Sequence, residues 1–301
     1  MARFAFRRSL VNTLTIFAGC VAIWGTTWLA ITHQIGSVAP EASVAWRFLL
    51  AGLLVAAWCA LRGLPLRFRP AEHAALAALG LAMYSVSYIF VYHAERHVAS
   101  GLVAVGYSAS PLLAMFGLRI VFGQPMTARM ALGSLFGISG IALVYWPEFG
   151  RLAEGGGAAL GALFTALAVL VTTSGGLVAH RNHQRGLHGW PTMAWSMGYG
   201  GLVALAVALA LGRPLDFDPS PAYVLSLLYL AVPGSILAFA GFLTLLGRIG
   251  AARASYIGVM VPIVALLIST AFEGFTWHVL TVAGIAVSVA GNVFVLRGAP
   301  R

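Results

Sequence analysis

The chain has 301 residues, of which 60% are hydrophobic and 9% are charged. Soluble domains carry about 25% charged residues, so this chain lacks the polar surface of a water-soluble fold. The net charge of +10 would suggest a nucleic-acid partner if the basic residues were clustered, but the 18 arginines lie singly or in small groups between apolar runs. The composition therefore excludes a soluble domain and nucleic-acid binding, and it indicates a polytopic membrane protein in a lipid bilayer.

The N-terminal stretch MARFAFRRSLVNTLTIFAGCVAIWG combines basic residues with an apolar run, as a signal peptide does. The apolar run is about 20 residues long, which exceeds the usual hydrophobic region of a signal peptide. No small-x-small cleavage site closes it. We therefore expect an uncleaved first membrane span.

Apolar runs separated by glycine, proline and charged residues predict ten membrane-spanning helices. Each run is long enough to cross a hydrocarbon core of about 30 Å. We expect the helices near residues 12–33, 41–61, 72–92, 97–121, 127–146, 158–180, 190–211, 222–246, 250–272 and 277–296. Because a span must satisfy its own backbone polar groups in lipid, the predicted fold is all-α.

The arginines predict the orientation of these helices. If the N-terminus is cytoplasmic, 14 arginines fall on the cytoplasmic side, and Arg96, Arg151 and Arg213 fall outside. The remaining one, Arg47, lies within a span. Since cytoplasmic loops are enriched in arginine and lysine, both termini are predicted to be cytoplasmic.

The two halves of the sequence resemble each other. GLPLRFRPAEHAALAALGL at 63–81 matches GRPLDFDPSPAYVLSLLYL at 212–230 at an offset of 149 residues, and the same offset pairs Trp46 with Trp195. An alternative is that loops between membrane helices converge on glycine and proline. Five spans per repeat is an odd number, so the repeats would enter the membrane from opposite sides. Such inverted repeats are typical of transporters with a substrate site near the midplane.

The expected domains are a repeat at 1–147, an outer linker at 148–157 that ends in GGG, and a second repeat at 158–301. The motifs in the spans are IWGTTW in the first, RFLLAG in the second, LVAVGYSASPLLAMF in the fourth and ASYIGVMVPIVALL in the ninth. With these motifs, residues 12 to 296 resemble the ten-helix EamA-type members of the drug/metabolite transporter superfamily. The resemblance implies export of small metabolites, often amino acids including aromatic ones, across a bacterial inner membrane. It does not fix the substrate.

Arg47 lies about 10 Å into the second predicted helix, at 1.5 Å per residue from Pro40. Its helical neighbours supply no counter-charge, and its partner in the second repeat is Ser196. Three interpretations remain open at this stage. Arg47 binds a substrate carboxylate, pairs with Glu95 or Glu273 of another helix, or extends its side chain towards the outer membrane surface.

Aromatic residues near the middle of spans are candidates for the wall of a cavity, because a buried hydroxyl or indole N–H requires a partner. The candidates for substrate binding are Trp24, Trp28, Tyr84, Tyr88, Tyr107 and Tyr256. Helix packing is the alternative for all of them. Tyr92, Trp146, Trp190 and Trp277 are instead expected in an interfacial belt.

Three prolines, Pro111, Pro262 and Pro233, lie inside predicted spans, and the first two are partners in the repeat. Each frees a backbone carbonyl, so we expect kinks that flank a central pathway or contribute to gating. The pattern Gly133-x-x-x-Gly137 predicts close helix packing of the fifth span. The fifth and tenth helices could pack within a monomer or form the face of a homodimer.

No carboxylate lies in the middle of a span, which favours a facilitator or exchanger; His93 is a weak candidate for a proton switch. The alternatives are a proton-coupled exporter of cationic drugs, an intramembrane enzyme, and a membrane scaffold or receptor. We find no enzyme motif and expect no catalytic residues. His180, His183 and His188 lack carboxylate or cysteine partners, so no metal site and no cofactor are expected.

Overall fold

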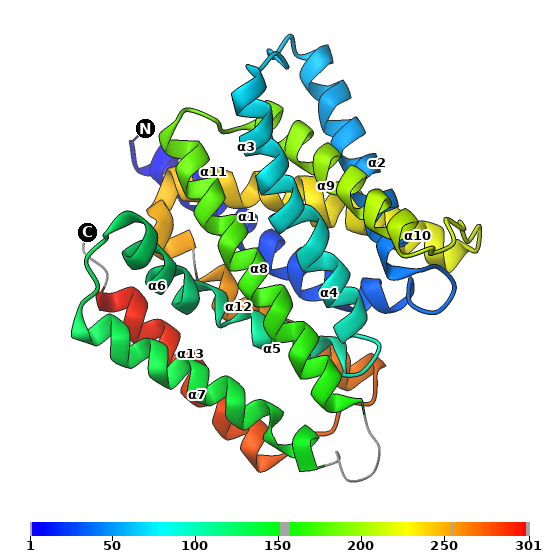
Figure 1. Cartoon of the computed structure of the whole chain (residues 1–301). Helices are drawn as coiled ribbons and strands as arrows, with labels where there is room; N and C mark the ends of the chain where they lie inside the picture. Colours follow the sequence, from blue (N-terminus) through cyan, green and yellow to red (C-terminus); the bar gives the residue numbers. More distant parts are fainter. Residues whose placement is uncertain (1, 151–156, 255, 299–301) are drawn as a thin grey trace.

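The computed structural model describes residues 2–150, 157–254 and 256–298. Helices make up the secondary structure of these residues, and no strand occurs among them (Figure 1). In the first half the elements are α1 (Ala2–Thr32), α2 (Pro40–Leu61), α3 (Pro70–Leu81), the π-helix η1 (Ala82–Val86), α4 (Ser87–Ala94), α5 (Ser100–Tyr107), α6 (Ser110–Phe122) and α7 (Ala128–Gly150). In the second half they are α8 (Ala158–Gln184), α9 (Trp190–Ala210), α10 (Pro221–Tyr229), the π-helix η3 (Leu230–Leu237), α11 (Ala238–Ala254), α12 (Ile257–Phe272) and α13 (Val279–Gly298).

Eight helical segments are long and apolar enough to cross a membrane, and α12 and α13 contain two shorter apolar helices. The third predicted span consists of α3, η1 and α4, the fourth of α5 and α6, and the eighth of α10, η3 and α11. The predicted all-helical polytopic membrane protein is therefore confirmed. Residues 151–156 of the expected linker lie outside the described residues.

Proline and glycine set the ends of several helices. Pro40 and Pro70 occupy the first turns of α2 and α3, where a missing N–H costs no hydrogen bond. Gly63 and Gly212, which pair in the sequence repeat, follow α2 and α9 with φ of +64° and +61°. Only glycine adopts this left-handed conformation without strain, so both helices end at the same place in their repeat.

Helices α7 and α13 lie side by side along their length (Figure 1). Small residues form the seam between them. A Cβ at Gly140 would collide with the backbone of Gly284 and Ser288, and one at Gly133 would lie 2.9 Å from the carbonyl oxygen of Gly291. Higher numbers on α7 face lower numbers on α13, so the two helices are antiparallel. The glycine pattern of the fifth span therefore serves packing within the monomer.

Two further pairs of helices that correspond in the two halves, α2 with α9 and α5 with α12, also pack antiparallel. On α2 and α9, a Cβ at Gly52 would lie 3.0 Å from the Cα of Gly198, and Leu49 lies against Gly201. On α5 and α12, Gly101 faces Ser269. Small residues at these crossings let the backbones approach closely, as in other membrane helix bundles.

Candidate functional site

A cavity of about 340 Å³ lies in the middle of the bundle. Its wall is formed by side chains of α1, α2, η1, α4, α5, α6, α8, α11 and α12. No residue of α7, α9 or α13 is part of the described wall. The volume falls at the lower end of the range of about 300–1,000 Å³ typical of small-molecule pockets, so the cavity suits one small solute.

Arg47 is part of this wall although its side chain is only 1% exposed. Its Nε donates a hydrogen bond to Ser235 Oγ at 3.2 Å, and its guanidinium carbon lies 4.5 Å from the centre of the Tyr88 ring. Its Nη1 is buried without a hydrogen-bond partner. Ser235, the Tyr88 ring and a hydrogen bond with Tyr92 therefore hold the guanidinium in place, and one donor, Nη1, remains without a partner.

Neither acidic residue considered as a partner pairs with Arg47: both oxygens of Glu95 are without a hydrogen bond, and Glu273 is engaged elsewhere, as is the further acidic residue Glu41. Glu41 lies 2.9 Å from His93 Nε2 and 4.0 Å from Arg213 Nε. Glu273 accepts hydrogen bonds from the backbone N–H and the hydroxyl of Ser100, at 3.1 and 2.6 Å. Within the described part of the chain, the ion pairs do not include Arg47.

Four of the six aromatic candidates line the cavity together with Arg47: Trp24, Trp28, Tyr88 and Tyr107. The indole N–H of Trp24 donates to the Gly234 carbonyl at 3.1 Å. The Tyr107 ring lies 5.2 Å from that of Trp28, and its hydroxyl is 3.1 Å from Thr172 Oγ1. The fixed rings form a largely apolar wall around the guanidinium.

The other two candidates are not part of the wall. Tyr84 is buried between Phe48 and Phe239, whose ring centres lie 5.4 and 5.6 Å away. Tyr256 precedes the first residue of α12 and does not line the cavity. The interfacial expectation for Tyr92 is wrong, because this residue is fully buried and donates to Gln34 Oε1 at 2.7 Å.

Two of the three predicted kink prolines border the cavity. Pro111 lies in the first turn of α6, directly after the break between α5 and α6 at residues 108–109. Pro262 lies inside α12 and also lines the cavity. Pro233 lies inside η3, two residues before the Ser235 that binds Arg47.

The sequence did not reveal the role of Ser235, and it did not predict that Glu95 is buried without a partner. Ser235 bonds Arg47 from η3, and a lone serine after a proline in the apolar run AVPGSIL was the available signal. The Glu95 carboxylate follows the third span and is buried with neither oxygen hydrogen-bonded. Burial raises the pKa of Glu95 well above its usual value; the charge of Glu273 raises it further and that of Arg47 opposes the shift.

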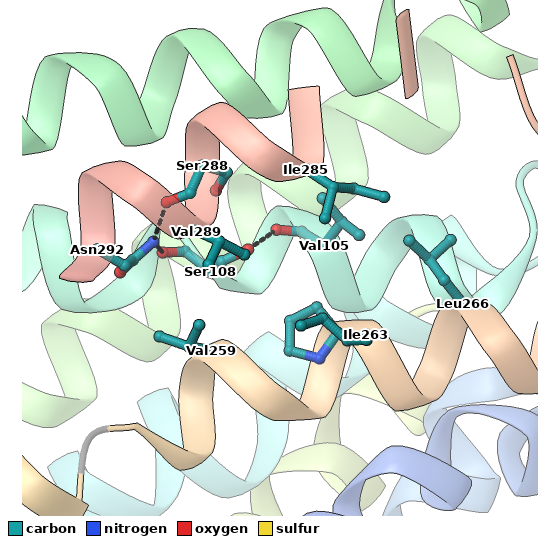
Figure 2. Close-up of a pocket in the computed structure, with 10 residues that line it drawn as sticks. Val105, Ser108, Val259, Ile263, Leu266, Ile285, Ser288, Val289 and Asn292 are labelled. Atoms are coloured by element: carbon teal, nitrogen blue, oxygen red, sulfur yellow. Dashed lines mark hydrogen bonds between the residues drawn. The ribbon is translucent and has the colours of Figure 1, made fainter. Parts of the chain in front are cut away.

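A second pocket lies where α5, α12 and α13 meet (Figure 2). Its volume is about 10 Å³, which is close to the minimum space for one water molecule. Asn292 Nδ2 donates to the carbonyl oxygens of Ser108 and Ser288 at 3.4 and 3.0 Å. This pocket is too small for an organic solute and is a packing gap between α5, α12 and α13.

The sequence profile of the EamA-like transporter family matches residues 12–146 and again residues 159–297. The uncharacterized inner membrane transporter YedA of Escherichia coli (strain K12) is 30% identical over 295 residues, which cover 97% of this chain and 93% of that protein. Protein PecM of Dickeya dadantii is 26% identical over 87% of this chain and 84% of that protein.

A solved crystal structure of a protein with 17% sequence identity superposes with a TM-score of 0.66 and covers 94% of this chain and 97% of that one. At this identity the likeness concerns the fold alone. The two profile matches cover most of the sequence, and the apolar helices of the structure are those of a multi-pass inner-membrane protein. The chain belongs to the EamA-like transporter family of the drug/metabolite transporter superfamily.

Proposed function

We propose that this transporter exports small metabolites, with amino acids including aromatic ones as the first candidates, by alternating access around the cavity beside Arg47. The observation that carries the proposal is the free Nη1 of a buried guanidinium in the wall of an aromatic cavity. Burying a cation without a counter-charge inside a membrane protein costs free energy, so such a residue marks a functional site. A substrate carboxylate supplies its missing counter-charge.

The proposed architecture is a pair of inverted five-helix repeats, at residues 1–147 and 158–301, joined by an outer linker at 148–157. The antiparallel packing of corresponding helices supports inversion, because α7 lies against α13 and α2 against α9. The π-helices also correspond: residues 82–86 of η1 fall at 231–235, within η3, at the repeat offset of 149. Inverted repeats give two related conformations that open to opposite faces of the membrane.

Both termini are proposed to be cytoplasmic. The support is the excess of arginine on that side, together with the start of α1 and the end of α13, which lie on the same side of the bundle (Figure 1). We take the monomer as the transporting unit, because the seam of small residues on α7 is already occupied by α13. A homodimer would have to use another surface.

The proposed mechanism is facilitated transport or exchange, driven by the concentration gradient of the substrate, since the described wall of the cavity contains no acidic side chain that could carry a proton. One observation favours the alternative of a proton-coupled exporter of cationic compounds: the unpaired, buried carboxylate of Glu95. Glu95 follows the third span and is absent from the cavity wall. The two mechanisms differ in their response to an imposed pH gradient.

The test is transport by purified protein in liposomes or by inside-out vesicles. Labelled Phe, Tyr, Trp, Thr and Met are measured with and without a pH gradient, and protein-free liposomes are the control. We expect saturable movement of at least one amino acid at a rate independent of the gradient. Failure across a broad metabolite panel would contradict the proposed exporter, and strict dependence on the gradient would replace facilitation by proton coupling.

A further inference from the structure

The cavity wall has an unbalanced charge. Among its described residues Arg47 is the charged one, and no aspartate or glutamate accompanies it. The nearby acidic groups lie outside the wall: Glu41 is held by His93 and Arg213, and Glu273 by Ser100. Glu95 is buried with neither oxygen hydrogen-bonded, and burial raises its pKa and so favours its neutral form, although the charge of Arg47 opposes this shift. An occupant with one negative charge and no positive charge would balance the charge of Arg47 in this wall.

The unused hydrogen-bonding groups of the wall also suit an anion. Arg47 Nη1 and Ser110 Oγ, at the start of α6, are both buried without a hydrogen-bond partner, and both residues line the cavity. The first residues of α6 and α12 line the cavity. Helix N-termini carry a partial positive charge, and in transporters with broken helices such ends face anionic groups of the substrate.

An ammonium group finds no equivalent partner there. The hydroxyls of Tyr107 and Thr172 bond to each other, and the Tyr88 ring already lies against the Arg47 guanidinium. A second cation on that ring would meet Arg47 at short range. Burial of an ammonium without a counter-charge or strong acceptors is unfavourable.

We propose that the cavity binds organic monocarboxylates with an apolar, preferably aromatic, body, and that the α-ammonium group of an amino acid does not contribute to binding. The carboxylate lies against Arg47, and the body lies against the rings of Trp24, Trp28 and Phe242. This inference rests on the proposed function, because it assumes that the cavity is the substrate site. It narrows the substrates from amino acids in general to carboxylates.

The experiment compares three compounds that share a phenyl body and differ in charged groups: 3-phenylpropionate, L-phenylalanine and phenethylamine. Binding to purified full-length protein in detergent is measured by isothermal titration calorimetry. We expect 3-phenylpropionate to bind at least as tightly as L-phenylalanine, and phenethylamine to bind at least about tenfold more weakly, since one charge-assisted hydrogen bond is worth about this factor. Tighter binding of L-phenylalanine, comparable binding of phenethylamine, or no binding of any compound would overturn the inference.

Two variants test the role of the guanidinium. Arg47→Gln should weaken 3-phenylpropionate at least about tenfold, whereas Arg47→Lys keeps a charge and should lose less. Size-exclusion profiles show whether both variants are folded. If a variant is not folded, the three titrations of the wild-type protein alone test whether the cavity prefers a carboxylate without an ammonium group. Equal binding by wild type and a folded Arg47→Gln would overturn the inference. The amino-acid transport panel is independent of these titrations, so amino-acid export with failed phenylpropionate binding would refute this inference alone.

Discussion

Arg47 and Ser196 occupy corresponding positions on α2 and α9, but only Arg47 borders the cavity. Both side chains are buried, on helices that pack against each other. Arg47 lines the cavity and bonds Ser235, whereas Ser196 is outside the cavity wall and its hydroxyl has no partner. The two halves therefore place corresponding helices in similar packing, and the guanidinium of Arg47, which the second half lacks, lies at the candidate site.

The largest expected effect separates these two residues. Arg47→Ala removes a charged hydrogen-bond donor, and we expect transport of carboxylate substrates to fall about ten- to hundredfold. Ser196→Ala should leave transport unchanged, because the hydroxyl contacts neither cavity nor partner. Initial rates in liposomes at matched protein density measure both. Equal losses in the two variants would show that the difference between the halves has no functional meaning.

The second prediction concerns residues that the halves share. Gly140→Ala and Gly291→Ala each place a methyl group against the backbone of the facing helix, and overpacking of this kind costs about 1–3 kcal/mol or more. We expect similar, large losses of folded protein in size-exclusion chromatography and of apparent Tm. Gly176→Ala is the matched control, since a Cβ there meets nothing within 4 Å. If only one seam variant were unstable, the two sides of the seam would not be equivalent.

A third pair makes a finer comparison. Trp46 donates its indole N–H to the Asp216 carbonyl at 3.2 Å, and its repeat partner Trp195 donates to the Leu66 carbonyl at 2.9 Å. Each tryptophan thus binds the loop of the other half. Trp46→Phe and Trp195→Phe should each lower stability by about 0.5–1.5 kcal/mol, which thermal unfolding in detergent can measure. A loss confined to one variant would mean that only one loop is held this way.

A fourth expected effect is the pH dependence of stability caused by Glu95. Since its pKa is raised in the folded chain, the stabilisation is complete below the unfolded value of about 4.3 and is lost as pH rises through the folded-state pKa. The apparent Tm should decline over this range, and Glu95→Gln should flatten the decline. Asp216→Asn, at an exposed loop position, is the control. An unchanged pH profile in Glu95→Gln would assign the decline to other groups.

The sequence predicted the spans well, because apolar length and breaking residues depend on the bilayer alone. The third span shows the limit of this reasoning. Tyr84 and Tyr88 are four residues apart and both approach Phe48, as a shared helix face predicts. The π-helix η1 intervenes, however, and only Tyr88 reaches the cavity. A wide helical turn has no marked pattern in a single sequence.

The surroundings of Arg47 could not be predicted for a similar reason. Its partner Ser235 lies 188 positions away in sequence, and its contact depends on how α2 crosses η3. Burial of Glu95 likewise depends on the packing around the end of α4. Charge counts and helical periodicity locate such residues along the membrane normal, but tertiary packing decides which other side chain each one meets.

The seam between α7 and α13 has a mechanical consequence. Contact between backbones leaves no rotamers that could absorb a displacement, so the energy of sliding these two helices rises steeply. Neither helix borders the cavity. In the proposed alternating-access mechanism, the rearrangements that expose a bound solute first to one compartment and then to the other therefore fall on the segments interrupted by prolines and π-helices. The α7–α13 pair would move as one rigid unit.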